Sequence, residues 1–209
     1  LKKDGTCWVN IGDTLRNKSL MNIPFKFTIE MCNRGWIHRN TIIWHKPNAM
    51  PASVKDRFTV DFEYLFFFVK NKQYYFEQQF EPMKDVSIAR MKRGNSNNHK
   101  NINGAPGQTK HTMNQPRSND KTRETPTLRN KRTVWNIATK GLKGAHFAIF
   151  PTELIETPIK AGCPEDGIVL DPFMGSGTTA IVAKQLGRNY LGFELNPEYI
   201  ELANKRIGD

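Results

Sequence analysis

Two acidic residues beside a glycine-bearing turn are the clearest chemical feature of this 209-residue chain. Residues 171–179 read Asp-Pro-Phe-Met-Gly-Ser-Gly-Thr-Thr and follow an apolar run at residues 167–170. Since the run predicts a strand and residues 178–186 have a helical pattern, the turn leads from a strand into a helix N-terminus. Gly175 and Gly177 have no Cβ, so the backbone there can approach a ligand closely. With Glu194 at the end of the next apolar run, the pattern predicts a cofactor crevice between two strand ends.

Two kinds of cofactor fit this spacing. Gly175, Gly177 and Ala180 match the dinucleotide fingerprint, in which an acid after the following strand binds the ribose hydroxyls. Asp171 argues against a dinucleotide, because its carboxylate would face the negatively charged pyrophosphate in a narrow crevice. S-adenosylmethionine has no phosphate, and Asp171 can hold the ammonium of its methionine end while Glu194 accepts from the ribose. The alternative is an ordinary strand-turn-helix-strand-helix unit that binds no ligand, in which the two acids have no binding role.

The rest of the pattern predicts the elements that position this crevice. Apolar runs predict three strands in the first half of the chain, namely Thr6–Ile11, residues 41–44 and residues 64–70. Phe62–Val69 is nearly all apolar, as expected for a strand that is covered on both faces. Helices are predicted at residues 20–34, with Pro24 near the start, and at residues 151–161, with Leu154, Ile155 and Ile159 as the apolar stripe. Asn196 is predicted to cap a further helix, because Pro197 and Glu198 favour a first turn.

The second half carries further short motifs around the crevice. They are His-Phe-Ala-Ile-Phe-Pro at residues 146–151, Leu-Ile at 154–155, the run from Val169 to Thr179, Gly-Arg at 187–188 and Gly-Phe-Glu at 192–194, followed by Tyr199 and Arg206. In this order they resemble the amino-group DNA methyltransferases of the circularly permuted, beta-type arrangement, in which the cofactor motifs come last. Those enzymes methylate the exocyclic amine of adenine or cytosine.

The first half resembles the target-base half of the same family. The matching stretches are residues 6–13, 40–51, 57–58 and 63–70. The resemblance implies a three-layer, Rossmann-like α/β fold with a mostly parallel sheet and an antiparallel hairpin. It divides the chain into a target-base half at residues 1–80, a basic flexible target-recognition insert at 81–133 and a cofactor-binding half at 134–209. It also implies methyl transfer from S-adenosylmethionine to N6 of adenine or N4 of cytosine in double-stranded DNA.

The resemblance assigns residues of this chain to the cofactor. His146 stands where the family closes over the methionine end, and a capping hydrogen bond is the alternative for it. The implied cofactor-binding residues are Asn10, Gly12, Asp13, His146, Ala148, Phe150, Asp171, Pro172, Phe173, Gly175, Ser176, Gly177, Thr178, Thr179, Glu194 and Asn196.

The catalytic motif of the family is not found in the chain. It consists of Asp, Asn or Ser followed by Pro-Pro and an aromatic residue, and no Pro-Pro dipeptide occurs here. The motif order places this tetrapeptide upstream of Leu1, so we expect no catalytic residue in this chain and no methyl transfer by it alone. A non-catalytic DNA-binding remnant or modification subunit is the alternative. A nicotinamide-dependent oxidoreductase is disfavoured by Asp171 and by the basic insert.

Positive charge is abundant and unevenly placed. The formal net charge is +11 and the sequence pI is about 9.7, values that are typical of a nucleic-acid partner. Residues 84–132 hold twelve Lys and Arg against three Asp and Glu, and residues 82–133 contain no aromatic residue. Such a segment cannot bury enough apolar surface to form a core of its own. We therefore predict a flexible basic arm that contacts DNA, with a solvated linker as the alternative.

Residues before the insert could add to a DNA surface. Trp44 and Lys46 are two apart on an extended segment and point the same way, so they could frame a base and a phosphate. The alternative is a core tryptophan and a surface lysine. The predicted DNA-binding residues are Trp44, Lys46, Arg57, Arg90, Lys92, Arg93, Arg123, Arg129 and Arg132.

Cysteine spacing and hydropathy bear on the setting of the protein. Cys7, Cys32 and Cys163 are far apart and lack C-x-x-C spacing, which argues against a disulfide framework and a zinc site and fits a reducing cytoplasm. The sequence has no apolar run of membrane-spanning length. We expect a cytoplasmic, bacterial or phage-encoded protein without a metal. A missing N-terminal segment, a homodimer and a cognate restriction enzyme are the further partners that the resemblance implies.

Overall fold

The computed structural model of the chain describes residues 1–92, 127–140 and 150–208. Two compact units are distinguished within it. The larger unit contains residues 1–79 and 132–209, and the smaller one contains residues 80–131. The predicted crevice belongs to the larger unit.

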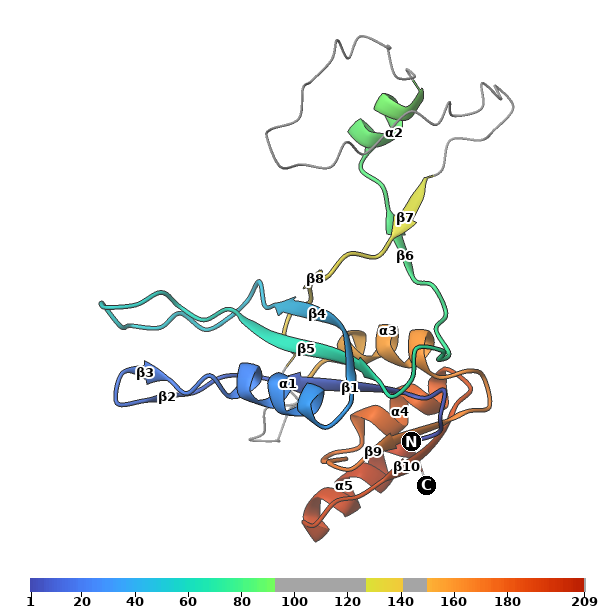
Figure 1. Cartoon of the computed structure of the whole chain (residues 1–209). Coiled ribbons are helices and arrows are strands. Elements are labelled where there is room, and N and C mark those ends of the chain that lie inside the picture. Colours follow the sequence, from blue (N-terminus) through green and yellow to red (C-terminus); the bar gives the residue numbers. More distant parts are fainter. Residues whose placement is uncertain (93–126, 141–149, 209) are drawn as a thin grey trace. The chain divides into compact units, whose positions relative to one another are not determined.

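A four-stranded sheet organises the first half of the larger unit (Figure 1). Its strands lie in the order β1 (Thr6–Ile11), β5 (Phe62–Val69), β4 (Ile37–His45) and β8 (Val134–Asn136). β5 is antiparallel to both β1 and β4, and β4 is parallel to β8. The predicted antiparallel hairpin is therefore β4–β5, but this sheet is mixed and not mostly parallel. The reason is that β5 lies between β1 and β4, and a strand that returns directly from its neighbour must run antiparallel to it.

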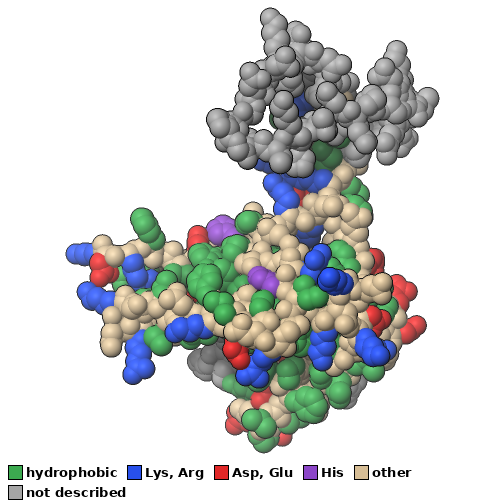
Figure 2. Space-filling model, viewed as in Figure 1, with side chains coloured by type: hydrophobic (Ala, Val, Ile, Leu, Met, Phe, Trp, Pro, Cys, Tyr) green, Lys and Arg blue, Asp and Glu red, His purple; other side chains and the backbone are tan. Residues whose placement is uncertain are grey.

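Two extensions project beyond the ends of β1 and β4. One is the hairpin of β2 (Leu15–Arg16) and β3 (Ser19–Leu20), and the other is the long connection of residues 46–61 between β4 and β5. They run side by side at the left of the view in Figures 1 and 2, and an ion pair joins them, with 3.2 Å between Lys18 Nζ and Asp56 Oδ2. We call them the two arms. The β3 strand also corrects the predicted helix start, because α1 begins at Ile23 and not at residue 20.

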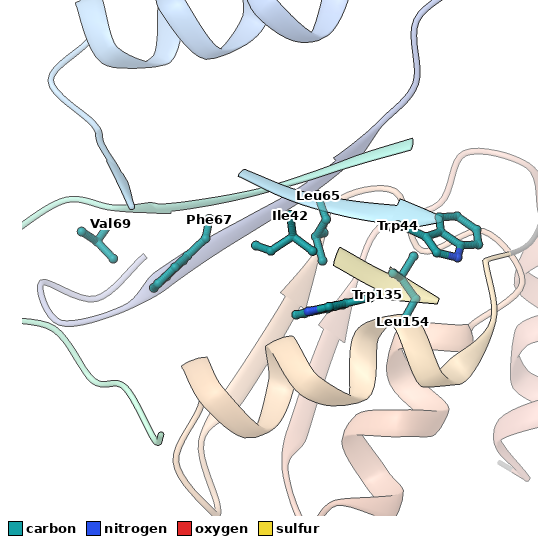
Figure 3. Close-up of a cluster of buried hydrophobic side chains, with 7 residues drawn as sticks. All are labelled: Ile42, Trp44, Leu65, Phe67, Val69, Trp135 and Leu154. Carbon is teal, nitrogen blue, oxygen red and sulfur yellow. The ribbon is translucent and has the colours of Figure 1, made fainter. Parts of the chain in front are cut away.

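Helices cover both faces of the four-stranded sheet. On one face, α1 (Ile23–Asn33) brings Phe27 against Phe68 of β5, with 6.3 Å between ring centroids. On the other face, α3 (Thr152–Gly162) contributes the fully buried Leu154 to a cluster with Leu65, Phe67 and Val69 (Figure 3). The run Leu65–Val69 is buried throughout, so the prediction of a strand covered on both faces is confirmed.

The second half of the larger unit is a strand-helix-strand-helix unit. β9 (Ile168–Asp171) pairs in parallel with β10 (Asn189–Gly192), and α4 (Thr178–Gln185) connects them. Val182 and Ala183 of α4 pack with Ile159 of α3 in a second cluster, so α3 contributes to both clusters, with Leu154 in the first and Ile159 in the second. α5 (Pro197–Ile207) follows β10, and the side chain of Asn196 accepts from the backbone N–H of Glu198 at 3.0 Å. The predicted N-cap is therefore confirmed.

The smaller unit has regular structure at both ends of the basic segment. β6 (Phe80–Pro82) pairs antiparallel with β7 (Leu128–Asn130), and α2 (Asp85–Lys92) follows β6. Arg129 Nε donates to Glu81 Oε1 at 2.9 Å across the two strands. These ends are more ordered than the prediction of a flexible arm over residues 81–133 implied, because backbone pairing satisfies their polar groups without a hydrophobic core. Residues 93–126, on which much of that prediction rests, lie outside the described residues.

Candidate cofactor site

The two predicted acids follow adjacent parallel strands. Asp171 is the last residue of β9 and is paired in register with Gly192, the last residue of β10. Glu194 comes two residues after Gly192. Because the carboxyl ends of parallel strands open at the same edge of a sheet, both acids border the same loops. This is the place where ligands bind in open α/β sheets.

Asp171 is held in a fixed orientation by its own turn. Its Oδ1 accepts from the backbone N–H of Phe173 at 2.9 Å, and its Oδ2 accepts from the hydroxyl of Thr179 at 2.5 Å. An ionised carboxylate offers about four acceptor positions, so these two bonds leave about two of them for a ligand. Asp171 can therefore accept from an ammonium group without rearranging the turn.

Glu194 lies beside the same turn, on the loop that follows β10. Its Oε2 accepts from the N–H of Gly175 at 2.8 Å, and its Oε1 accepts from the N–H groups of Leu195 and Asn196, both at 2.9 Å. The N–H of Asn196 contributes most to holding the pKa of Glu194 below its usual value of 4.5, and the N–H groups of Gly175 and Leu195 add to it. The side chain is therefore an anion at neutral pH. Three of its roughly four acceptor positions are occupied, so a ribose diol would compete with the Gly175 N–H.

The two glycines of the turn, Gly175 and Gly177, differ in what surrounds the position where a Cβ would lie. Gly177 has φ +82°, and a Cβ there would come within 3.0 Å of the Cβ of Ala203 in α5. Gly175 has φ +54°, but the nearest atom to its Cβ position is 3.9 Å away. Packing against α5 therefore requires Gly177, whereas the side of Gly175 is open toward a ligand.

Arg206 stands in the family pattern of the sequence without a predicted role, and the structure shows it at this site. From α5 its Nη1 donates to the backbone oxygen of Ser176 at 2.5 Å and to the Ser176 hydroxyl at 2.5 Å. Ser176 is 9% exposed, and burial lowers the pKa of Arg206. The guanidinium thus fixes the residue between the two glycines. The sequence contains Arg206 within the family pattern, but no local signal connects it with a serine 30 residues earlier.

The other turn residues divide into exposed and enclosed ones. Pro172 and Phe173 are exposed, with 86% of Phe173 accessible to solvent. Ser176, Thr178 and Thr179 are buried, and their hydroxyls bond within the turn and to Arg206. The enclosed residues shape the crevice, and the exposed ones can contact a ligand.

The structure also describes several predicted cofactor residues from the first half of the chain. Asp13 accepts from the N–H groups of Asn22 and Ile23 at 3.0 and 3.2 Å, so its carboxylate caps the start of α1. Its cofactor contact stays a prediction. Asn10 Nδ2 donates to the backbone oxygen of Tyr64 at 3.1 Å, Gly12 is exposed, and Phe150 packs half-buried against the sheet core. His146 and Ala148 lie outside the described residues.

Trp44 is a core residue, against the prediction that it frames a base. It is 3% exposed, and its Nε1 donates to the backbone oxygen of Ile137 at 2.8 Å. Lys46 does point the same way, with its Nζ 4.5 Å from the centroid of the Trp44 ring, and it forms an ion pair with Glu63. The stacking role fails because the indole packs in the hydrophobic cluster with Leu65, Trp135 and Leu154, which leaves almost none of it exposed to a base.

The remaining predicted DNA-binding residues fall into three groups. Arg57, Arg90 and Arg132 have exposed positions, and Lys92 ends α2. Arg129 is half-buried in its ion pair with Glu81. Arg93 and Arg123 lie outside the described residues.

Within the described part of the chain, no group of three His, Cys, Asp or Glu side chains could hold a metal ion. No helix described by the structure has the length and hydropathy to cross a bilayer.

Comparison with known proteins places this site in a family. A family model described as DNA methylase, of the N6 and N4 type, matches residues 1–205. The type II methyltransferase M.Cfr9I of Citrobacter freundii is 35% identical over 99% of this chain and 66% of its own length. The type II methyltransferase M.SmaI of Serratia marcescens is 34% identical over 99% of this chain and 68% of its own length. The chain thus spans about two thirds of the length of these relatives.

Solved structures show the same fold at lower identity. The cytosine-N4-specific PvuII DNA methyltransferase superposes with a TM-score of 0.69 at 20% identity, covering 100% of this chain and 66% of that one. The M1.HpyAVI–SAM complex gives a TM-score of 0.64 at 23% identity, covering 100% and 77% of the two chains. These likenesses confirm the predicted Rossmann-like α/β methyltransferase fold. From the match over residues 1–205, this chain belongs to the DNA methylase family whose members methylate amino groups at N6 or N4.

Proposed function

We propose that the protein transfers a methyl group from S-adenosylmethionine to the exocyclic amine of adenine (N6) or cytosine (N4) in DNA. The observation that carries this proposal is the pair of oriented carboxylates at the ends of β9 and β10. An acidic crevice suits a cationic ligand and disfavours a pyrophosphate. Membership in the DNA methylase family supports the same reaction and DNA as the substrate.

The residues of the crevice would divide the cofactor between them. Asp171 would accept from the ammonium of the methionine end, and Glu194 would accept from a ribose hydroxyl. Phe173 and Leu195, 86% and 98% exposed on loops that follow adjacent strands, offer apolar surface for the adenine. S-adenosylmethionine supplies the electrophilic methyl group that the amine of the base displaces. The protein's contribution is to hold the two reactants in line, which depends on a rigid crevice.

A titration separates this function from its rivals. We expect the chain to bind S-adenosylhomocysteine and not NAD in calorimetry, since only NAD brings a pyrophosphate to Asp171. Binding of NAD in preference would overturn the proposal.

The absence of a Pro-Pro dipeptide favours a second candidate, a chain that binds cofactor and DNA without transferring methyl groups itself. Transfer of label from S-adenosylmethionine to duplex DNA by this chain would exclude that second candidate.

Glu194→Gln should weaken S-adenosylhomocysteine binding about tenfold. An amide can keep an oxygen toward Leu195 and Asn196, but it then turns its NH₂ toward the N–H of Gly175, and it loses the charge that favours the ribose contact. Calorimetry with S-adenosylhomocysteine and with its 2′-deoxy analogue, on both proteins, gives a coupling energy. If Glu194 binds the ribose, the substitution costs less with the deoxy analogue. An equal loss with both ligands would show that the carboxylate only closes the turn.

We also propose that the basic segment is the target-recognition insert and contacts DNA phosphates. Its composition supports this, because the twelve Lys and Arg of residues 84–132 face only three acids in the sequence. Replacing residues 93–126, which contain six Lys and Arg, by a short Gly-Ser linker should flatten the dependence of DNA affinity on salt. Each lost phosphate contact lowers the slope of log K against log salt by about 0.9. A slope equal to that of the intact chain would make the segment a linker.

The proposal extends to the location and the protein partners of the enzyme. We propose a cytoplasmic site of action and a homodimer as the working form of the enzyme. A cognate restriction enzyme is proposed because the similar M.Cfr9I and M.SmaI are named type II methyltransferases. Mass photometry of the purified chain tests the dimer directly.

A further inference from the structure

The two arms enclose an open crevice that no part of the cofactor site uses. It has a volume of about 460 Å³ and is lined from the β2–β3 hairpin by Leu15, Lys18 and Leu20 and from the β4–β5 connection by Arg57, Phe58 and Val60. Both arms follow strands that run in the same direction, because β1 and β4 are each antiparallel to β5. The crevice therefore lies beyond the carboxyl ends of these strands.

The surface of the arms combines cations with apolar side chains. Arg16, Lys18, Lys55 and Arg57 are exposed there, and the arms contain two acids, Asp56, which pairs with Lys18, and Asp61, which pairs with His45. The Lys18 and Asp56 side chains are 88% and 63% exposed, and an ion pair in such a position contributes little to stability. Phe58 is 96% exposed and lies beside Arg57. Figure 2 shows blue and green side chains together over the arms at the left of the view.

The turn of the β2–β3 hairpin has a lysine at a position where glycine is favoured. Asn17 and Lys18 link the paired residues Arg16 and Ser19, and both have positive φ, 51° and 64°. A two-residue hairpin turn with two positive φ values favours Asn followed by Gly. Lysine has no such preference, so its presence costs conformational energy that glycine would avoid. Strain of this kind, at a side chain that is almost fully exposed, points to a contact outside the chain.

We propose that the two arms form a second DNA surface, in which Lys18, Lys55 and Arg57 contact phosphates and Phe58 packs on sugar or base edges. The occupant is duplex DNA, because clustered cations match phosphate charge and an exposed aromatic ring beside them matches the apolar parts of a nucleotide. The inference rests on the proposed function, and it adds Lys18, Lys55 and Phe58 to the residues that bind the substrate.

A charge-matched pair of variants tests this surface. One variant replaces Lys18, Lys55 and Arg57 with Gln, and the control replaces Lys26, Lys72 and Lys205, which are exposed elsewhere in the same unit, with Gln. Fluorescence anisotropy with a duplex of about 20 base pairs is measured over a salt series. We expect the arm variant to lower the salt slope by about 2.7, at about 0.9 for each phosphate contact, and the control to change it little. Equal effects in both variants would overturn the proposal.

Two single substitutions remove the remaining ambiguity. Lys18→Gly should raise the melting temperature slightly, because glycine relieves the turn, and should still weaken DNA binding. A purely structural lysine would show no loss of affinity, which contradicts the proposal. Phe58→Ala should lower DNA affinity about fivefold with an unchanged salt slope, whereas Ile29→Ala, 60% exposed on α1, should have no effect.

Cofactor binding separates the failure of this inference from failure of the proposed function. The arm variant should bind S-adenosylhomocysteine as the unmodified chain does, since the arms contribute nothing to the β9–β10 crevice. If the unmodified chain binds the nucleoside but not DNA, the arm surface is wrong and the cofactor assignment stands. If it binds DNA through the arms but not the nucleoside, the proposed reaction fails and the DNA surface stands.

Discussion

Asp171→Asn should reduce the affinity for S-adenosylhomocysteine by about 10- to 100-fold and leave the free energy of unfolding nearly unchanged. A hydrogen bond to a charged partner contributes about 1.5–3 kcal/mol, and each 1.4 kcal/mol is a factor of ten in affinity. The asparagine oxygen can still accept from the N–H of Phe173, and its NH₂ can donate to the hydroxyl of Thr179, which rotates to accept. The turn therefore keeps its shape and loses only its negative charge.

Calorimetry and urea unfolding of the same protein measure the two halves of this prediction. The matched control is Asp166→Asn, which makes the same change in an exposed loop before β9 and should leave affinity unchanged. Asp166 has φ +59°, a conformation that asparagine tolerates well. Unchanged affinity in the Asp171 variant would remove the ammonium contact from the proposal. A large loss of stability would instead make Asp171 a structural residue of the turn.

Gly177→Ala should destabilise the protein by about 2–5 kcal/mol. A left-handed backbone costs an alanine about 1–2 kcal/mol, and forcing a methyl group into a packed contact costs about 1–3 kcal/mol more. The packed contact is with α5, where the new Cβ would lie 3.0 Å from the Cβ and 3.2 Å from the Cα of Ala203. Backbone and helix must therefore shift together, and the Arg206 bonds to Ser176 move with them.

Gly187→Ala separates strain from crowding. Gly187 also has a left-handed backbone, with φ +69°, but nothing lies within 4 Å of its Cβ position. Its substitution should cost only about 1–2 kcal/mol, the strain alone. Urea unfolding of both variants gives the difference directly. Equal costs at the two positions would mean that α5 yields freely, and the account of Gly177 as a packing glycine would then be wrong.

The elements around the crevice could be predicted because their signals are local. β1 has the predicted bounds Thr6–Ile11. Asn196 caps α5 by accepting from the backbone N–H of Glu198, only two residues later in the chain. Residues 167–194 form a strand, a glycine turn, a helix and a strand that ends near an acid. Each of these elements depends on neighbours within a few residues, so the local sequence pattern predicts their order. The family motifs belong to the same class of signal, and the match over residues 1–205 confirms the family that they predicted.

The predictions that failed depended on contacts between distant residues. Trp44 looked available on an extended segment, but it is enclosed by a segment 93 residues later in the chain, to which its Nε1 is bonded. A mostly parallel sheet with an antiparallel hairpin was predicted, and the hairpin is present, but the four-stranded sheet is mixed because β5 lies between β1 and β4 and runs antiparallel to both.

The sequence by itself determined the kind of crevice, namely two carboxylates and a glycine turn between a strand and a helix. Residue types and short spacings suffice for that, because hydrogen bonding along the chain selects the local conformation. Only the tertiary structure decided which of these atoms remain open to a ligand. Asp171 keeps acceptor positions, most of those of Glu194 are taken by backbone N–H groups, and Gly177 is required by α5. The Glu194 bond to Gly175 and the contact of Gly177 with Ala203 join different elements, so they depend on how those elements pack, which the local pattern does not state.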